Sequence, residues 1–217
     1  MLIVDCPELK AVVDRQFGLV AYKQAAELGF TAEAIRATVH TGRWRMVLPK
    51  VYLIDPGARF TGLDVEQKRT AAGLYTAGLG HLSGLSALAW HGVADLPAHD
   101  TVLMLIPHQV RRVSYDFVRV QRTRRFDPTA RQAGRYHVCG VARATADACR
   151  HLTDIDDVSR LVGLVIGLGR TTVGALRTEL AHAGSSRTRP LRLVLQQFGE
   201  SGGSGTIVDS SVHVRWK

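Results

Sequence analysis

Three short helical patterns, each ended by a glycine, constrain the fold of this chain more than any other feature of its sequence. The patterns predict helices over residues 8–16, 22–28 and 32–41, closed by Gly18, Gly29 and Gly42. Glycine adopts the left-handed conformation that ends a helix without steric cost. Two strand-like runs, 43–48 and 51–54, follow directly and are joined by a Pro-Lys pair. Residues 8–54 therefore indicate one compact unit.

The order of these elements is that of a winged helix-turn-helix, in which two helices meet at a tight turn and a β-hairpin follows. We predict such a DNA-binding domain over residues 8–56. Thr31 is the expected N-cap of the third helix, because threonine accepts a hydrogen bond from the first turn. The third helix is the one that would enter the major groove of DNA, which is wide enough for a single helix.

The outward positions of the third helix and the cations of the hairpin are the candidate DNA contacts. We predict that these are Arg36, His40, Arg43, Arg45 and Lys50. Arg36 is placed to reach a guanine edge or a phosphate, and the hairpin cations to neutralise phosphates. The alternatives are a solvated helix face and an ordinary strand in which Trp44 is buried between two exposed arginines.

The rest of the chain predicts a mixed αβ domain over residues 63–198, so that the fold class is α+β with a small sheet and C-terminal helices. The expected helices are 64–77, 86–91 with Ser83 as N-cap, 145–151, 156–167, 171–183 and 190–197. Between them, β-rich runs predict strands over 101–106, 117–122 and 136–141. A Gly/Ser-rich stretch opens residues 199–217, which we predict to be a flexible tail.

The charge of the chain favours a polyanionic partner. Lysine and arginine number 28 against 19 acidic residues, which gives a net charge of +9. Residues 108–135 alone hold eight arginines and two aspartates. We predict a secondary basic surface there, made of Arg111, Arg112, Arg119, Arg122, Arg124 and Arg125. It would contact a nucleic-acid backbone or dock an acidic protein, and the plain alternative is a solvated hairpin.

The sequence offers no pattern for catalysis, a metal or a cofactor, so we predict no enzyme and no cofactor. The three cysteines are widely spaced, which favours a reducing cytoplasm over a disulfide framework or a zinc site. The nine histidines form no HExxH motif, and the run SGLS at 83–86 is not a nucleophile elbow and is expected to lack a strand before it. Neither a membrane span nor a signal peptide is predicted.

The residues of the N-terminal unit resemble a known family. The stretch FGLVAYKQAAELGFTAEAIRATVHTGRWRMVLPKVYLI looks like the N-terminal domain of actinobacterial AbiEi-type antitoxins. The matching residues are Gly18, Gln24, Ala25, Gly29, Ile35, Gly42, Arg43, Trp44, Val51 and Tyr52, and Lys50 stands where the family usually has glycine. Weaker likenesses are HLSGLSALAWHGV, through Ser83, Ser86, Ala87, His91 and Gly92, and VARATADACRHL, through Ala144, Thr145, Asp147 and Leu152. Together they cover residues 8–198.

The resemblance implies a type IV toxin–antitoxin system. The protein would bind its own promoter, at an inverted repeat, and residues 63–198 would counter a nucleotidyltransferase-type toxin without a stable complex. Many relatives continue into a nuclease domain similar to very-short-patch repair (Vsr) endonucleases. After Gln197 this chain has one glutamate, Glu200, and one aspartate, Asp209, so we expect that domain to be absent. The alternatives are a truncated or split nuclease-family member and a basic protein-interaction module.

Overall fold

The computed structural model describes residues 6–55, 57, 60–183 and 186–200. Within them the chain is a mixed α+β protein, as predicted. Its helices are α1 (Pro7–Asp14), α2 (Tyr22–Glu27), α3 (Ala32–His40), α4 (Val65–Tyr75), α5 (Gly84–Trp90), α6 (Val141–Cys149), α7 (Ile155–Gly167), α8 (Val173–His182) and α9 (Arg189–Glu200). Its strands are β1 (Leu19–Ala21), β2 (Trp44–Leu48), β3 (Val51–Ile54), β4 (His81–Ser83), β5 (Val102–Pro107), β6 (Val118–Thr123), β7 (Arg131–Ala133) and β8 (Tyr136–Val138).

The N-terminal unit, residues 6–55, is built on a three-stranded antiparallel sheet of order β1-β3-β2. One face of this sheet packs against α1, α2 and α3 through a core that includes Trp44, Tyr52 and Ile54. Its other face presents Leu48 and Leu53, which belong to the larger core of the molecule. Both faces of the small sheet therefore contribute to a hydrophobic core, while Arg45 and Met46 of β2 stay exposed.

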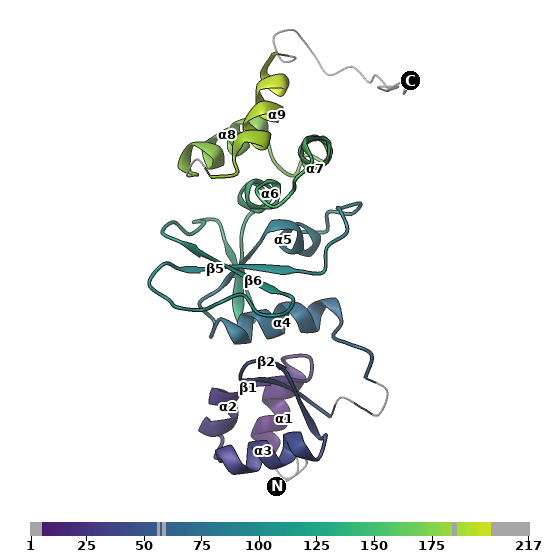
Figure 1. Ribbon diagram of the computed structural model, residues 1–217, viewed down its shortest axis with the longest axis vertical. Coiled ribbons are helices and arrows are strands. Elements are labelled where there is room, and N and C mark those ends of the chain that lie inside the picture. Colours follow the sequence, from purple (N-terminus) through teal and green to yellow (C-terminus); the bar gives the residue numbers. More distant parts are fainter. Residues whose placement is uncertain (1–5, 56, 58–59, 184–185, 201–217) are drawn as a thin grey trace.

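A five-stranded sheet of order β6-β5-β4-β8-β7 forms the centre of the second unit, residues 60–183 and 186–200. The sheet is mixed, because β4 pairs antiparallel with β5 but parallel with β8, and β5 pairs parallel with β6. Helix α4 lies on one face and α5 and α6 lie on the other (Figure 1). Helices α7, α8 and α9 stack beyond α6, at the end of the molecule farthest from the N-terminal unit.

Helix α4 joins the two units because it packs between both sheets (Figure 1). Its buried residues, such as Ala71 and Leu74, share one core with the leucines of the small sheet. Two side-chain hydrogen bonds also cross the boundary: Gln67 Nε2 donates to the Phe17 carbonyl at 3.1 Å, and Arg135 Nε donates to Gln16 Oε1 at 3.1 Å. Surfaces of the two units can therefore contribute to one site.

The longer elements lie close to their predicted positions, but three strands of three residues, β1, β4 and β7, were not predicted. Such short strands carry too little alternation to be recognised, and sheet pairing alone defines them. The helix predicted to begin at residue 145 begins instead at Val141. The expected strand to residue 141 was wrong, because Gly140 is the N-cap of α6 and β8 ends at Val138. Of the predicted tail, residues 199 and 200 belong to α9, whereas 201–217 lie outside the described residues, as does residue 56.

Candidate nucleic-acid interface

Helix α3 presents a polar face to solvent. Its first turn is capped by Thr31, whose hydroxyl accepts a hydrogen bond from the Ala34 amide at 3.2 Å. Ile35 points into the core, and Arg36 and His40 are exposed, as the helical period predicts. The side chain of Arg36 is 74% exposed, and its guanidinium lies 2.6 Å from the carboxylate of Glu33, one turn earlier. An exposed pair of this kind exchanges readily with other partners, so Arg36 is available to an incoming anion.

The hairpin places its arginines on different surfaces. Trp44 is buried against Phe30 and Tyr52, with ring centroids 5.6 and 5.8 Å away, as the alternation of the strand requires. Arg43 is exposed beside the end of α3. Arg45 is also exposed, but its guanidinium lies 4.6 Å from the centre of the Phe60 ring, on the side that faces the second unit. Arg45 would have to leave this ring to reach a phosphate beside α3.

Lys50 occupies the turn of the hairpin in a left-handed conformation, with φ of 65°. Few residues other than glycine adopt this conformation, and a lysine there is strained. The carbonyl of Lys50 accepts a hydrogen bond from the Tyr22 amide at 2.8 Å, which ties the turn to the first residue of α2. The Lys50 ammonium lies 5.9 Å from the centre of the Tyr22 ring. The cation at the tip of the hairpin is therefore held against the start of α2.

A crevice of about 450 Å³ opens beside this turn, between α2, the hairpin and the second unit. Its cations come from four places in the sequence: Lys23, Lys50, Arg112 and Arg135. The guanidinium of Arg112 lies 5.0 Å from the centre of the Tyr75 ring. Lys23 was not among the predicted contacts, and Arg135 was counted only as one of the eight arginines of residues 108–135. Their position beside Lys50 depends on the packing of the second unit on the small sheet, which the sequence does not reveal.

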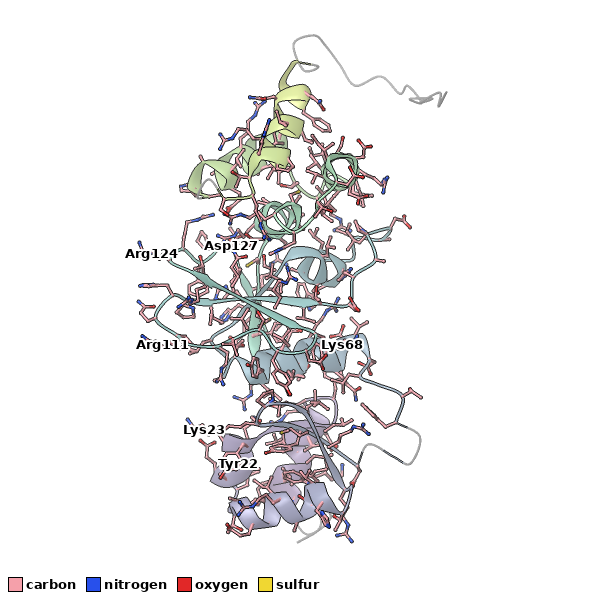
Figure 2. All side chains as sticks on the ribbon, in the orientation of Figure 1. Tyr22, Lys23, Lys68, Arg111, Arg124 and Asp127 are labelled. Carbon is pink, nitrogen blue, oxygen red and sulfur yellow. The ribbon has the colours of Figure 1, made fainter. Side chains whose placement is uncertain are left out.

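The secondary basic surface is divided among several places. Arg111 is exposed on the loop after β5, whereas Arg112 lines the crevice just described. Arg119 lies near α6, with its guanidinium 3.2 Å from Nδ1 of His151. The remaining members, Arg122, Arg124 and Arg125, line a cleft of about 340 Å³ between the end of β6 and α8. Figure 2 shows Lys23, Arg111 and Arg124 along the same side of the molecule.

A network of buried polar side chains contributes to the wall of the cleft beside α8. Ser83 Oγ donates to Asp147 Oδ2 at 2.8 Å, and Arg143 Nε donates to the same oxygen at 2.7 Å. Arg143 also lies 3.9 Å from Glu179, which is paired in turn with Arg125. Burial lowers the pKa of Arg143, but the adjacent Asp147 carboxylate outweighs this effect, and the net pKa is raised. The network links β4, α6 and α8 and holds Arg143 in its charged form.

Ser83 occupies the N-cap position of α5, as predicted, but its side chain makes no capping hydrogen bond, because its hydroxyl is committed to Asp147. The expectation that no strand comes before α5 was wrong, because β4 ends at Ser83. The residue is fully buried, however, so its hydroxyl is closed to a substrate. Cys139 and Cys149 are buried as predicted, and burial raises the pKa of each thiol to about 12.

His81, the first residue of β4, is packed between two aromatic rings and has a lowered pKa. Its ring is 4.2 Å from the centre of Phe126 and 4.7 Å from that of His137, and within the described residues its buried Nδ1 has no hydrogen-bond partner. The pKa of His81 is lowered from 6.5 to about 4, chiefly by burial and also by the charges of His137 and Arg143, while Asp127 opposes them. Burial raises the pKa of the Asp127 carboxyl, but hydrogen bonds from Thr129 and Gly140 outweigh this effect, and the net pKa is lowered.

We expect His81 to make the protein less stable in mild acid. The unfolded chain binds a proton near pH 6.5 and the folded chain only near pH 4, so stability is complete above pH 6.5 and is lost as the pH falls towards 4. His81→Phe keeps an aromatic ring in the stack and removes the titration. Urea unfolding at pH 7 and pH 5 should show a smaller loss of stability in His81→Phe than in the parent. The control is His108→Phe, which changes an exposed histidine, and equal losses in both variants would contradict the assignment.

No protein-family model matches the chain, and a search of curated proteins found no significant match. None of the helices in the described ranges is both long and apolar enough to cross a membrane. In the same ranges, His, Cys, Asp and Glu residues form no group of three that could hold a metal ion.

Proposed function

We propose that the protein is a DNA-binding, antitoxin-like transcriptional autoregulator. The observation that carries this proposal is the geometry of the N-terminal unit, in which a capped helix with an exposed arginine lies beside a three-stranded antiparallel sheet. The order β1-β3-β2 and the position of α3 before the hairpin suit a winged helix-turn-helix. The net charge of +9 supports a polyanionic partner.

In this proposal α3 enters the major groove with Arg36 and His40 towards the bases, and cations around it contact phosphates. Such backbone contacts position a protein on DNA, whereas contacts with base edges give specificity. Lys23 and Lys50 extend the surface around the start of α2 and the hairpin turn, and Arg111 continues it on the second unit (Figure 2). A mobility-shift assay with the DNA upstream of the gene, against a scrambled duplex of equal length, tests the proposal. Equal affinity for both duplexes would contradict it.

The antitoxin part of the proposal depends on the sequence resemblance over residues 63–198. It proposes that the second unit counters a nucleotidyltransferase-type toxin without a lasting complex. Co-expression with the product of the adjacent reading frame tests this: growth should recover, and the two proteins should not co-elute in size-exclusion chromatography. An adjacent frame that begins with Ser-x-x-Glu and carries a carboxylate cluster would favour a split nuclease instead.

We expect the purified protein not to cleave DNA in the presence of Mg²⁺ or Mn²⁺. A metal-dependent nuclease needs several carboxylates around its cations, and the described residues bring no such group together. The assay is incubation with supercoiled plasmid, which reveals a single nick. As a control for contaminating nuclease, the Arg36→Ala variant is purified in parallel. Nicking that follows the protein through purification, and that a single carboxylate substitution removes, would refute this expectation.

A further inference from the structure

The crevice between the two units has the size and position of a small-molecule site. Its volume of about 450 Å³ falls within the ~300–1,000 Å³ that ligand pockets occupy, and such pockets often lie where two units meet. The walls come from the start of α2, the turn of the hairpin and the end of α4. The β7–β8 hairpin adds Arg135, which is anchored by its hydrogen bond to Gln16.

The crevice has an excess of positive charge that no buried carboxylate balances. The one acidic residue that lines it, Glu27, is exposed and lies 3.8 Å from Lys23, and the described residues give Lys50, Arg112 and Arg135 no ion pair. The cleft beside α8 differs in this respect. There the mostly buried carboxylates of Glu179 and Asp147 pair with Arg125 and Arg143, so that these two arginines are already neutralised. The crevice is therefore the better anion site of the two.

One of these cations lies over an aromatic ring. The guanidinium of Arg112 is 5.0 Å from the centre of the Tyr75 ring, and the Tyr75 hydroxyl fixes that ring by donating to the Val113 carbonyl at 3.0 Å. A guanidinium supported by a ring on one side can stack a planar base on its other side. Leu74 and Pro49 supply apolar wall nearby. This combination suits a ligand with both a planar base and phosphates.

The conformation of Lys50 is compatible with a binding role but does not set this residue apart. Six other non-glycine residues in the described ranges also have a positive φ, among them Ala77, which lines the same crevice. A glycine would occupy the left-handed turn without strain, so the lysine costs stability where it stands. Lys50 gains no carboxylate partner in the described structure, and it lines the crevice.

We propose that the crevice binds a free nucleotide that carries two or three phosphates. Lys23, Lys50 and Arg135 face the phosphates, and the guanidinium of Arg112 stacks on the base. A DNA backbone offers the same phosphate chemistry, but it offers no free base to the wall beside Arg112. A bound nucleotide occupies the surface next to the start of α2 and the hairpin turn, and it therefore competes with a duplex that contacts this edge.

Isothermal titration calorimetry without DNA tests the proposal, with ADP, ATP, GTP and inorganic pyrophosphate as probes. Nucleotides should bind at one site, and at least tenfold more tightly than pyrophosphate, because only they stack on Arg112. Lys50→Gly removes the cation and relaxes the turn, and it should weaken every probe about tenfold or more, as the loss of a charge-assisted hydrogen bond does. Arg112→Ala should abolish the preference for nucleotides over pyrophosphate.

The matched control is Arg160→Ala, which removes an exposed arginine on α7 and should leave binding unchanged. The proposal is overturned if no nucleotide binds at millimolar concentration, or if Lys50→Gly and Arg160→Ala behave alike. A duplex-binding assay is run separately with the same variants. If Lys50→Gly weakens DNA binding although no nucleotide binds, the crevice serves DNA phosphates and the nucleotide proposal fails. Conversely, nucleotide binding without DNA binding would remove the proposed function and leave this inference intact.

Discussion

Asp147→Ala is expected to lower the free energy of unfolding by about 3–5 kcal/mol, the cost of removing one partner from a buried ion pair. The side chain of Asp147 is 2% exposed and that of Arg143 is 9% exposed. Removal of the carboxylate leaves the guanidinium of Arg143 buried, with Glu179 at 3.9 Å as its remaining acidic partner among the described residues. It also removes the acceptor of the Ser83 hydroxyl, which is fully buried.

Urea unfolding followed by circular dichroism measures this loss. Asp157→Ala is the matched control, because Asp157 pairs with Arg160 on a helix surface where the arginine is 70% exposed. Exposed pairs contribute about 0–1 kcal/mol, so the control should change little. Asp147→Asn should fall between the two, since the amide still offers an oxygen to Ser83 and Arg143. Equal, small effects of Asp147→Ala and Asp157→Ala would show that the network does not support the fold.

Arg36→Ala should reduce affinity for the operator by about tenfold or more and affect a scrambled duplex less. An arginine that binds a base edge with two hydrogen bonds contributes about 1–3 kcal/mol of discrimination, and 1.4 kcal/mol corresponds to a factor of ten. The structure places Arg36 on the exposed face of α3, where, among the described residues, Glu33 is the acid that pairs with it. Arg36→Lys keeps the charge without the planar fork, so it should preserve affinity for the scrambled duplex and lose operator preference. Competition binding with both duplexes measures these differences.

The hairpin variants separate backbone contacts from base contacts. Arg43→Ala should weaken both duplexes about equally, and Arg45→Ala should do so if Arg45 leaves the Phe60 ring on binding. The double substitution Arg124→Ala and Arg125→Ala should leave operator preference intact, because these residues line the cleft beside α8. If Arg36→Ala lowers both affinities alike, Arg36 does not read bases. If the Arg124 and Arg125 pair alone abolishes binding, the N-terminal unit is not the part that binds DNA.

The N-terminal elements could be predicted because their signals are local. Gly29, with φ of 86°, and the N-cap Thr31 mark the turn between α2 and α3 in the sequence itself. Ile35 and Trp44 likewise reveal which side of each element is buried. The exposure of Arg36 and His40 follows from the helical period alone, and the structure agrees with it. Their contact with DNA stays a prediction.

The crevice and the buried network could not be predicted, because both depend on packing between distant segments. Arg135 and Gln16 are 119 positions apart, and Ser83 and Asp147 are 64 apart. The position of Ser83 before a helical pattern predicts a cap, but the buried carboxylate of Asp147 is a stronger partner for its hydroxyl than a helix amide. The basic stretch around Arg125 is typical of a solvated surface. The pairing of Arg125 with Glu179 could not be predicted, because it requires α8 to fold against the end of β6.

The dependence of operator binding on salt tests most directly whether this protein is a DNA-binding regulator. Affinity for the upstream duplex and for its scrambled counterpart is measured by fluorescence anisotropy over a series of salt concentrations. We expect a preference for the upstream duplex and a steep, linear fall of log affinity with log salt, because each neutralised phosphate releases counterions. Arg43→Ala should lower the slope by about one unit. A flat salt dependence, or binding that does not distinguish the two duplexes, would contradict the claim that this protein is a DNA-binding regulator.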